Sequence, residues 1–224
     1  MAEQADLALA LKFLGGLAKN NNKPWFEEHR DQYDRSMAAF EALVGGLIGG
    51  MSSLEDLDGI APKDCIMRIY RDVRFSKDKS PYKTGLGAGI APGGRKGGRL
   101  GYHLHLGPQG ATMVAGGMWD PMPEHLARFR DAIVKDARPF LAIVGAAAFR
   151  KHFGAVTGEA LKTAPKGYPP DHPQLDLLRL KQVCVSEKFP DDVVTSGRFP
   201  ALAVASMKAM KPFIDYLNEI AMRR

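Results

Sequence analysis

The sequence predicts an α+β protein with a mostly antiparallel central sheet packed by N- and C-terminal helices. Two observations support this class. Apolar residues recur at three- and four-residue steps near both ends of the chain, whereas the middle contains short alternating segments joined by glycine-rich turns. With 224 residues, of which 45% are apolar and 25% charged, the composition is that of an ordinary globular chain. We therefore expect a single domain over residues 1–224.

The N-terminal part is expected to form two helices. The first covers residues 7–18 and stops at a polar run. The second should begin near Pro24, where Asn22 provides an N-cap and proline is tolerated in the first turn, and should end near Gly50. Its core-facing side chains recur at helical spacing: Trp25, His29, Tyr33, Met37, Phe40, Val44, Leu47 and Met51.

The middle of the chain is expected to supply the sheet. Residues 64–73 alternate and contain β-branched side chains, which predicts a strand whose charged end leads into a loop. The glycine-rich turns that follow are typical of antiparallel hairpins. We expect the other strands at residues 86–90, 100–106, 112–115 and 180–189.

Helices are expected again in the C-terminal part. Helical spacing returns from Pro123, and a further helix is predicted at residues 140–149, after Pro139. A proline-rich loop at residues 162–173 precedes the last strand. The closing helix, residues 200–222, contains Pro212, which should kink or split it.

Several classes of protein are disfavoured by composition. The acidic N-terminus is unlike a secretory signal, and the longest uncharged runs fall well short of the roughly 20 residues that span a bilayer. Cys65 and Cys184 are far apart and follow no metal-ligand spacing. We therefore expect a cytoplasmic protein with reduced, buried thiols, and with no metal, no cofactor and no membrane partner.

Positive charge is concentrated between Arg68 and Arg99. This stretch has nine Lys and Arg residues and only two acidic ones, Asp72 and Asp78, which gives it a net charge of +7. Because the formal net charge of the whole chain is +6, the remaining residues together carry about −1. Concentrated like charge is costly unless water or an anion offsets it. The stretch is therefore either a solvated face or an anion site.

The order of residues 66–74 predicts two different faces if the chain is extended. One face would hold Arg68, Tyr70, Asp72 and Arg74, and the other Met67, Ile69, Arg71 and Val73. Guanidinium groups two residues apart, about 7 Å along a strand, can jointly bind phosphate or carboxylate oxygens. Asp72 between them could orient an arginine or act as a base.

The next segment adds to this pattern. Ser80-Pro81-Tyr82-Lys83 is typical of a capped helical turn, whose free N–H groups would strengthen anion binding. We expect the cations to converge on one concave site, with Asp72 and Tyr82 as acid–base groups. The predicted ligand-binding residues are Arg68, Arg71, Arg74, Lys79 and Lys83. The alternative is an ion-pair network that ties a loop to the sheet.

These residues also resemble a known family. The run Arg68-x-x-Arg71-Asp72-x-Arg74-Phe75, followed by Asp78-Lys79-x-x-Tyr82, is similar to the signature of a bacterial family of conserved hypothetical proteins, a domain of unknown function. Similar pieces elsewhere are Asn21-Asn22-Lys23-x-Trp25-Phe26, Gly116-Gly117-x-Trp119-x-Pro121, and Gly167-Tyr168-Pro169-x-Asp171-His172-Pro173 before Leu177-Leu178-Arg179. The resemblance covers nearly the whole chain and implies a one-domain cytoplasmic bacterial protein with no assigned reaction. This sequence departs from the family at His103, where an aromatic residue is expected.

Two weaker motifs accompany the basic segment. His103 and His105 would project from one side of a strand, as in some metal sites, but no third ligand can be named, which favours a polar sheet face. The glycine-rich run from Gly93 to Arg99 lacks P-loop spacing, which favours a mobile hairpin tip over a phosphate-binding loop.

Two functions are consistent with the sequence. The first is a cofactor-independent enzyme or binder for a small phosphorylated or carboxylated molecule. The second is a nucleic-acid-binding module that uses the same cations on phosphates. It ranks second because aromatic residues are not interleaved as a base-stacking platform and no known nucleic-acid motif is present.

Overall fold

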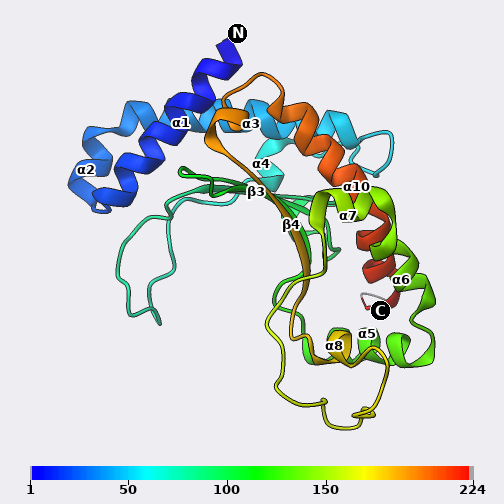
Figure 1. The fold of residues 1–224 in the computed structure, drawn as a ribbon. Coiled ribbons are helices and arrows are strands. Elements are labelled where there is room, and N and C mark those ends of the chain that lie inside the picture. The colour runs from blue at the N-terminus through cyan, green and yellow to red at the C-terminus, as the bar shows by residue number, and fades with distance from the viewer. Residues whose placement is uncertain (1, 222–224) are drawn as a thin grey trace. The chain divides into compact units, whose positions relative to one another are not determined.

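The computed structural model describes residues 2–221 and confirms the α+β class (Figure 1). The strands form one antiparallel sheet in the order β1-β2-β3-β4. These strands are β1 (Leu86–Ile90), β2 (Tyr102–Leu106), β3 (Thr112–Met118) and β4 (Val183–Phe189). The chain divides into two compact units. The first comprises the described residues up to Gly98, His103–Val114 and Lys188–Ala205, and the second Arg99–Tyr102, Ala115–Glu187 and the described residues from Ser206 on.

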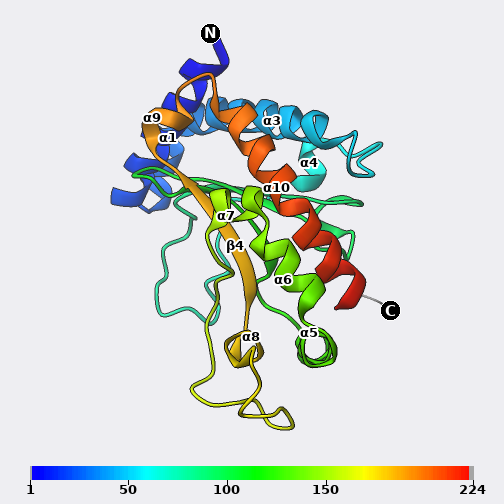
Figure 2. The same cartoon turned by 45° about the vertical axis from the view of Figure 1, so that its right-hand side comes forward.

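Helices of the first unit pack on one face of its strands. They are α1 (Ala2–Lys19), α2 (Lys23–Glu28), α3 (Arg30–Met51), α4 (Pro62–Cys65) and α9 (Asp191–Val194). The helices α1 and α3 lie side by side, and α3 and α4 contact β1 (Figures 1 and 2). Alternate residues of β1 and β2 are buried, for example Leu86, Ala88 and Leu104. The intervening residues, including His103 and His105, are only half-buried, so the opposite face of this part of the sheet is open.

The long helix predicted after Asn22 is wrong in one respect, because it is interrupted at His29. Asn22 caps the helix as expected, since its Oδ1 accepts from the N–H of Trp25 at 3.0 Å. His29 leaves helical geometry with φ −107° and ψ 22°. Its ring stacks on Trp25 and its Nδ1 lies 2.9 Å from the Trp25 carbonyl oxygen. The His29 side chain thus hydrogen-bonds to a backbone carbonyl group in the last turn of α2, and a separate helix, α3, begins at Arg30.

The strand predicted at residues 64–73 is also wrong. Its first residues belong to α4, and the rest is extended but pairs only through isolated bridges, Ile66 with Ala88 and Tyr70 with Tyr82. The predicted two faces are nevertheless present, because Arg68 and Tyr70 are exposed whereas Ile69 is buried. We call residues 66–84 the arginine loop; it extends away from the sheet in Figure 1.

Helices of the second unit include α5 (Pro123–Lys135), α6 (Arg138–Gly145), α7 (Ala147–Phe153) and α8 (Leu175–Arg179). The single helix predicted at residues 140–149 is wrong, since Ala146 adopts extended geometry with φ −61° and ψ 140° between α6 and α7. The closing helix α10 (Phe199–Ile220) runs through Pro212 without splitting. The predicted end at Met222 lies outside the described residues.

Two further properties bear on the predicted environment. Over the part of the chain that the structure describes, no helix is long and apolar enough to cross a membrane. Cys65 and Cys184 are both free; Cys65 is buried as predicted, whereas Cys184 is half-buried. Burial raises the pKa of the Cys184 thiol to about 11, so this side chain stays protonated at neutral pH.

Candidate functional site

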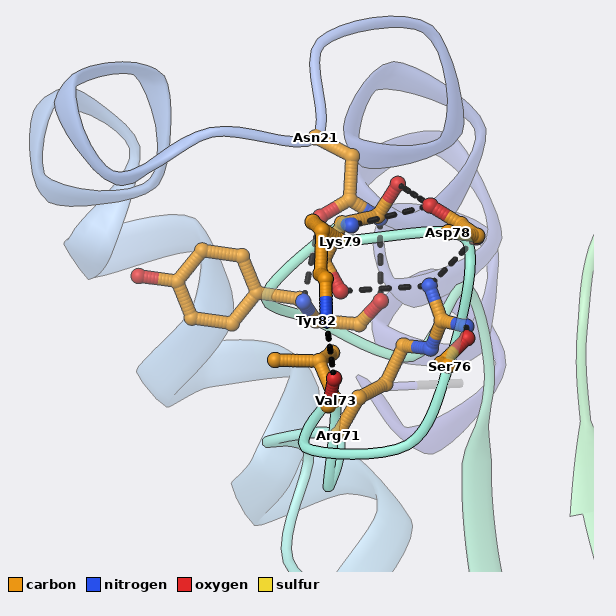
Figure 3. Close-up of polar contacts among 8 residues, drawn as sticks. Asn21, Arg71, Val73, Ser76, Asp78, Lys79 and Tyr82 are labelled. Carbon is orange, nitrogen blue, oxygen red and sulfur yellow. Dashed lines mark hydrogen bonds and ion pairs between the residues drawn. The ribbon is translucent and has the colours of Figure 1, made fainter.

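Arg71 closes the base of the arginine loop (Figure 3). Its guanidinium donates to the Asp78 carboxylate and, at 3.1 Å, to the Ser80 carbonyl oxygen. Asp78 also accepts from the N–H and the hydroxyl of Ser80, at 2.9 and 2.6 Å. These hydrogen bonds from Ser80, together with Arg71, lower the pKa of Asp78 to about 2. The carboxylate therefore remains ionised and offsets the charge of Arg71.

Two other predicted ligand residues are bonded within the loop itself. The Lys79 ammonium donates to the Val73 carbonyl oxygen at 2.9 Å. Arg74 binds Asp72 through two parallel hydrogen bonds of 3.0 and 2.7 Å, which lower the pKa of that carboxyl. Arg74 is therefore in a local ion pair and Lys79 in a backbone hydrogen bond, and both contacts lie within the arginine loop instead of tying it to the sheet.

Tyr82 fixes the arginine loop to the N-terminal helices. Its carbonyl oxygen accepts from Asn21 at 2.9 Å, and its N–H donates to Asn21 Oδ1 at 3.1 Å. The ring is 3% exposed and stacks on Phe26, with 4.1 Å between ring centroids. In Figure 3 its hydroxyl points away from Arg71. The segment that starts at Asn21 and the segment that ends at Tyr82, both part of the family resemblance, are therefore two halves of one contact.

The helical turn predicted at residues 80–83 is wrong. The chain there is extended, because it pairs with the outgoing arm of the loop. The N–H of Lys83 donates to the Ile69 carbonyl oxygen at 2.7 Å, and the Pro81 carbonyl oxygen accepts from the N–H of Arg71 at 2.9 Å. These groups are occupied by pairing, so they do not form the expected helix N-terminus.

A cavity of about 580 Å³ lies between the arginine loop and the open face of β1 and β2. All of its lining residues belong to the first unit. Its polar side chains come from α1 and its following turn, the loop and β2: Asn21, Arg71, Asp78, Ser80, Lys83, Thr84, His103 and His105. We call this cavity the cationic pocket.

Glycines of β1 and the residue before it make room for the two histidines. A Cβ atom at Gly85 would collide with the His105 ring, and one at Gly87 would lie 3.4 Å from Cε1 of His103. The two imidazole rings lie on the same side of β2, with centroids 6.4 Å apart. The glycines therefore give the two imidazoles room to lie against the backbone of this strand.

The cationic pocket has more positive than negative charge. Burial lowers the pKa of Lys83, and the charge of Arg68 adds to this effect. Burial likewise lowers the pKa values of His103 and His105, and the Lys83 charge lowers both further. Asp78 is the only carboxylate among the described residues that line the pocket, and Arg71 and Ser80 already bind it.

The structure brings together only some of the predicted site residues. Arg71, Tyr82 and Lys83 line the cationic pocket, so the expected convergence of all the cations is met only by Arg71 and Lys83. The others lie outside the lining: Arg68, Asp72, Arg74 and Lys79. Asn21, Ser80 and the two histidines were not predicted as site residues. The two histidines could have been found from the shared two-residue period of glycines in residues 85–89 and histidines in residues 103–105, but this period does not indicate Asn21 or Ser80.

The glycine-rich run after β1, predicted as a mobile hairpin tip, contains a short helical turn. Residues Gly94–Lys96 form a short 3₁₀ helix. The Arg95 guanidinium donates to the carbonyl oxygens of Ile66, Lys63 and Asp64 at 2.9, 3.3 and 3.4 Å. Arg95 thus holds the end of α4. Among the side chains that the structure describes, no group of three or more His, Cys, Asp or Glu residues is arranged to hold a metal ion.

Comparison with known proteins places the chain in one family. The family described as "Conserved hypothetical protein (DUF2461)" matches residues 9–216, a range that includes the arginine loop and every residue of the cationic pocket. No curated protein and no solved structure matches the chain. The chain belongs to the DUF2461 family of conserved hypothetical proteins.

Proposed function

We propose that the cationic pocket binds a small phosphorylated or carboxylated molecule through its anionic group, without a cofactor. The observation that carries this proposal is the unbalanced charge of the cavity. Lys83 forms no ion pair with a described residue, and the single lining carboxylate is already bound. An anion would offset the Lys83 charge and the cost of gathering cationic groups in a partly desolvated site.

The residues of the pocket are suited to oxygen-rich anions. The Lys83 ammonium supplies a point charge, and a neutral His105 imidazole has one N–H donor, whereas the His103 ring is hydrogen-bonded to the Ala88 backbone. The volume of about 580 Å³ lies within the roughly 300–1,000 Å³ that is usual for small-molecule sites.

The proposal is for binding rather than for a named reaction. Asp72 lies outside the pocket lining and is paired with Arg74. The Tyr82 hydroxyl points away from Arg71. Neither geometry supports the acid–base roles expected from sequence. If a proton is exchanged with the ligand, His103 and His105 are better placed to exchange it, since both line the cavity.

Thermal unfolding with a panel of anions tests the proposal. Inorganic phosphate, sulfate, phosphate monoesters and dicarboxylates are added to the full chain. At about 100 times its Kd, a bound anion adds roughly 2.7 kcal/mol, which raises the Tm by about 5 °C or more. Lys83→Ala should remove most of this rise. Lys96→Ala, an exposed lysine outside the pocket, is the matched control and should retain it. The proposal is rejected if no anion raises the Tm, or if both variants lose the effect equally.

A further inference from the structure

The outer face of the arginine loop carries two accessible aromatic rings among cations. Tyr70 is 48% exposed and Phe75 is 96% exposed. The cations of the same loop that lie outside the pocket lining are all exposed: Arg68, Arg74, Lys77 and Lys79. The sequence placed Tyr70 on a polar face but gave no reason to expect an exposed ring at Phe75, which follows the exposed Arg74 and therefore lies outside the two-residue alternation.

Tyr70 is held in place by the aromatic core of the first unit. Its ring lies 5.4 Å from that of Tyr82, which is stacked at 4.1 Å on Phe26. Phe26 in turn contacts the Tyr33 ring at 4.9 Å. Tyr70 is thus the solvent-exposed end of a series of packed rings. A ring held in this way loses little conformational freedom when a flat partner stacks on it.

Phe75 is presented by a part of the loop that is bonded on both sides. Lys79 is tied to the Val73 carbonyl oxygen, and Arg74 is tied to Asp72. The Arg74 guanidinium lies 5.9 Å from the centroid of the Phe75 ring. These bonds constrain the turn that carries a nearly fully exposed phenyl ring, so the ring is available to a partner.

We propose that this outer face binds single-stranded nucleic acid, with bases stacked on Tyr70 and Phe75 and phosphates near Arg68 and Arg74. Aromatic rings interspersed with cations are the usual chemistry of such binding. Residues 68–79 carry five cations and two carboxylates, a net +3. Stacking on exposed rings needs unpaired bases, which favours single strands over duplex.

A membrane surface fits the same face less well. Only two aromatic rings are available for insertion, and stable membrane attachment usually needs both a larger apolar contribution and a basic patch. Asp72 is also exposed among these cations and would face an anionic bilayer. Nucleic-acid binding here does not depend on the cationic pocket, because none of the four residues proposed to contact the strand lines it: Arg68, Tyr70, Arg74 and Phe75.

Fluorescence anisotropy of labelled 12-nucleotide single-stranded RNA and DNA tests this inference with the full chain. Tyr70→Ala and Phe75→Ala should each weaken binding about tenfold. Arg68→Ala should weaken binding and reduce the slope of log K against log salt by about 0.7. Trp119→Ala, which removes an exposed ring from the second unit, is the matched control and should bind like the unmodified chain. Lys83→Ala should retain most of the affinity, so the loss of the pocket and the loss of this surface are distinguishable.

Phe75→Trp supplies a direct signal for the nature of the contact. A stacked base should quench the added tryptophan emission after subtraction of the signal from Trp25 and Trp119. Insertion into phosphatidylserine vesicles would instead shift the emission to the blue. Quenching by oligonucleotides supports the proposal. A blue shift with vesicles but no quenching overturns it, as does equal loss of binding in Phe75→Ala and Trp119→Ala, or no binding at about 50 mM salt.

Discussion

The inner and outer faces of the arginine loop are built from the same residue types but hold them differently. On the inner face, the Arg71 side chain is 26% exposed and is bonded to the opposite arm of the loop. On the outer face, the Arg74 side chain is 77% exposed and hydrogen-bonds to Asp72, two residues away. Counting charges does not distinguish Arg71 from Arg74. Their positions do, because odd- and even-numbered residues of an extended chain point to opposite faces.

The difference in exposure between the two faces distinguishes residues whose contacts stabilise the fold from residues that are accessible to a binding partner. Inner-face residues connect distant parts of the chain, as Tyr82 does with Asn21 and Phe26. Outer-face residues are bonded locally or exposed. Substitutions on the inner face should therefore alter stability, and those on the outer face should alter binding with little change in stability.

The largest expected contrast is between two tyrosines of the loop. Tyr82→Ala removes a ring that is 3% exposed and stacked on Phe26, so it should lower the free energy of unfolding by about 3–5 kcal/mol. Tyr70→Ala removes a half-exposed ring and should cost less than about 1 kcal/mol. Chemical denaturation of both variants measures the difference. Equal losses would show that the two faces do not differ as described.

A smaller contrast is expected between neighbouring asparagines. Asn21→Ala removes both hydrogen bonds to the Tyr82 backbone, and we expect a loss of about 1–3 kcal/mol. Asn20→Ala removes one exposed bond to the Gly16 carbonyl oxygen and should cost less than about 0.5 kcal/mol. Denaturation midpoints at fixed slope give both values. If Asn20→Ala cost as much, the Asn21 contact with Tyr82 would not anchor the loop.

Local signals in the sequence were enough to predict much of the fold. The Asn22 cap, the first helix and the strand cores at β1 and β2 depend on neighbouring residues and were confirmed. The alternation of burial in residues 66–73 was also predicted, because it follows from extended geometry alone.

The features that sequence could not supply depend on distant partners. Residues 64–73 were read as a strand, but whether they pair continuously depends on Gly87 and on the returning arm of the loop. The cationic pocket depends on the register that sets Gly85 opposite His105. The break at His29 depends on its ring folding back onto Trp25. Of these pairings, only that of Gly85 with His105 leaves a periodic signal, in the two-residue spacing of the glycines in residues 85–89 and the histidines in residues 103–105.

The pH dependence of sulfate binding should sharpen the description of the inner face. Sulfate keeps its charge between pH 5 and 8, so any change in affinity reports on the protein. Burial and the Lys83 charge lower the pKa values of His103 and His105, and a bound anion should raise them. Binding therefore takes up protons, and the affinity should increase, by up to about tenfold per pH unit for one proton taken up, as the pH falls from 7.5 to 5.5.

His105→Ala supplies the control for this measurement, by calorimetric titration with sulfate at several pH values. It should flatten the dependence, whereas His172→Ala, outside the pocket, should leave it unchanged. A steep dependence that survives in His105→Ala and in His103→Ala would contradict the assignment to the imidazoles.

The smallest expected effect concerns Asp78, which supports Arg71 from a position that is 61% exposed in its side chain. Its pKa is about 2 in the folded chain, below the ordinary value of 3.8, because Ser80 and Arg71 bind the ionised form. A lowered pKa contributes stability above about pH 4, and this contribution is lost as the pH falls from about 4 to 2. Asp78→Asn lacks this contribution to stability at every pH. The Tm of this variant should therefore lie slightly below the Tm of the unmodified chain at pH 6, and the two Tm values should converge near pH 2. Solvent screening keeps the difference small.

Asp72→Asn, on the outer face, should show a still smaller difference because its partner Arg74 is two residues away in an exposed segment. A constant difference between pH 6 and pH 2 for Asp78→Asn would mean that the Asp78 carboxylate does not stabilise the loop through its charge.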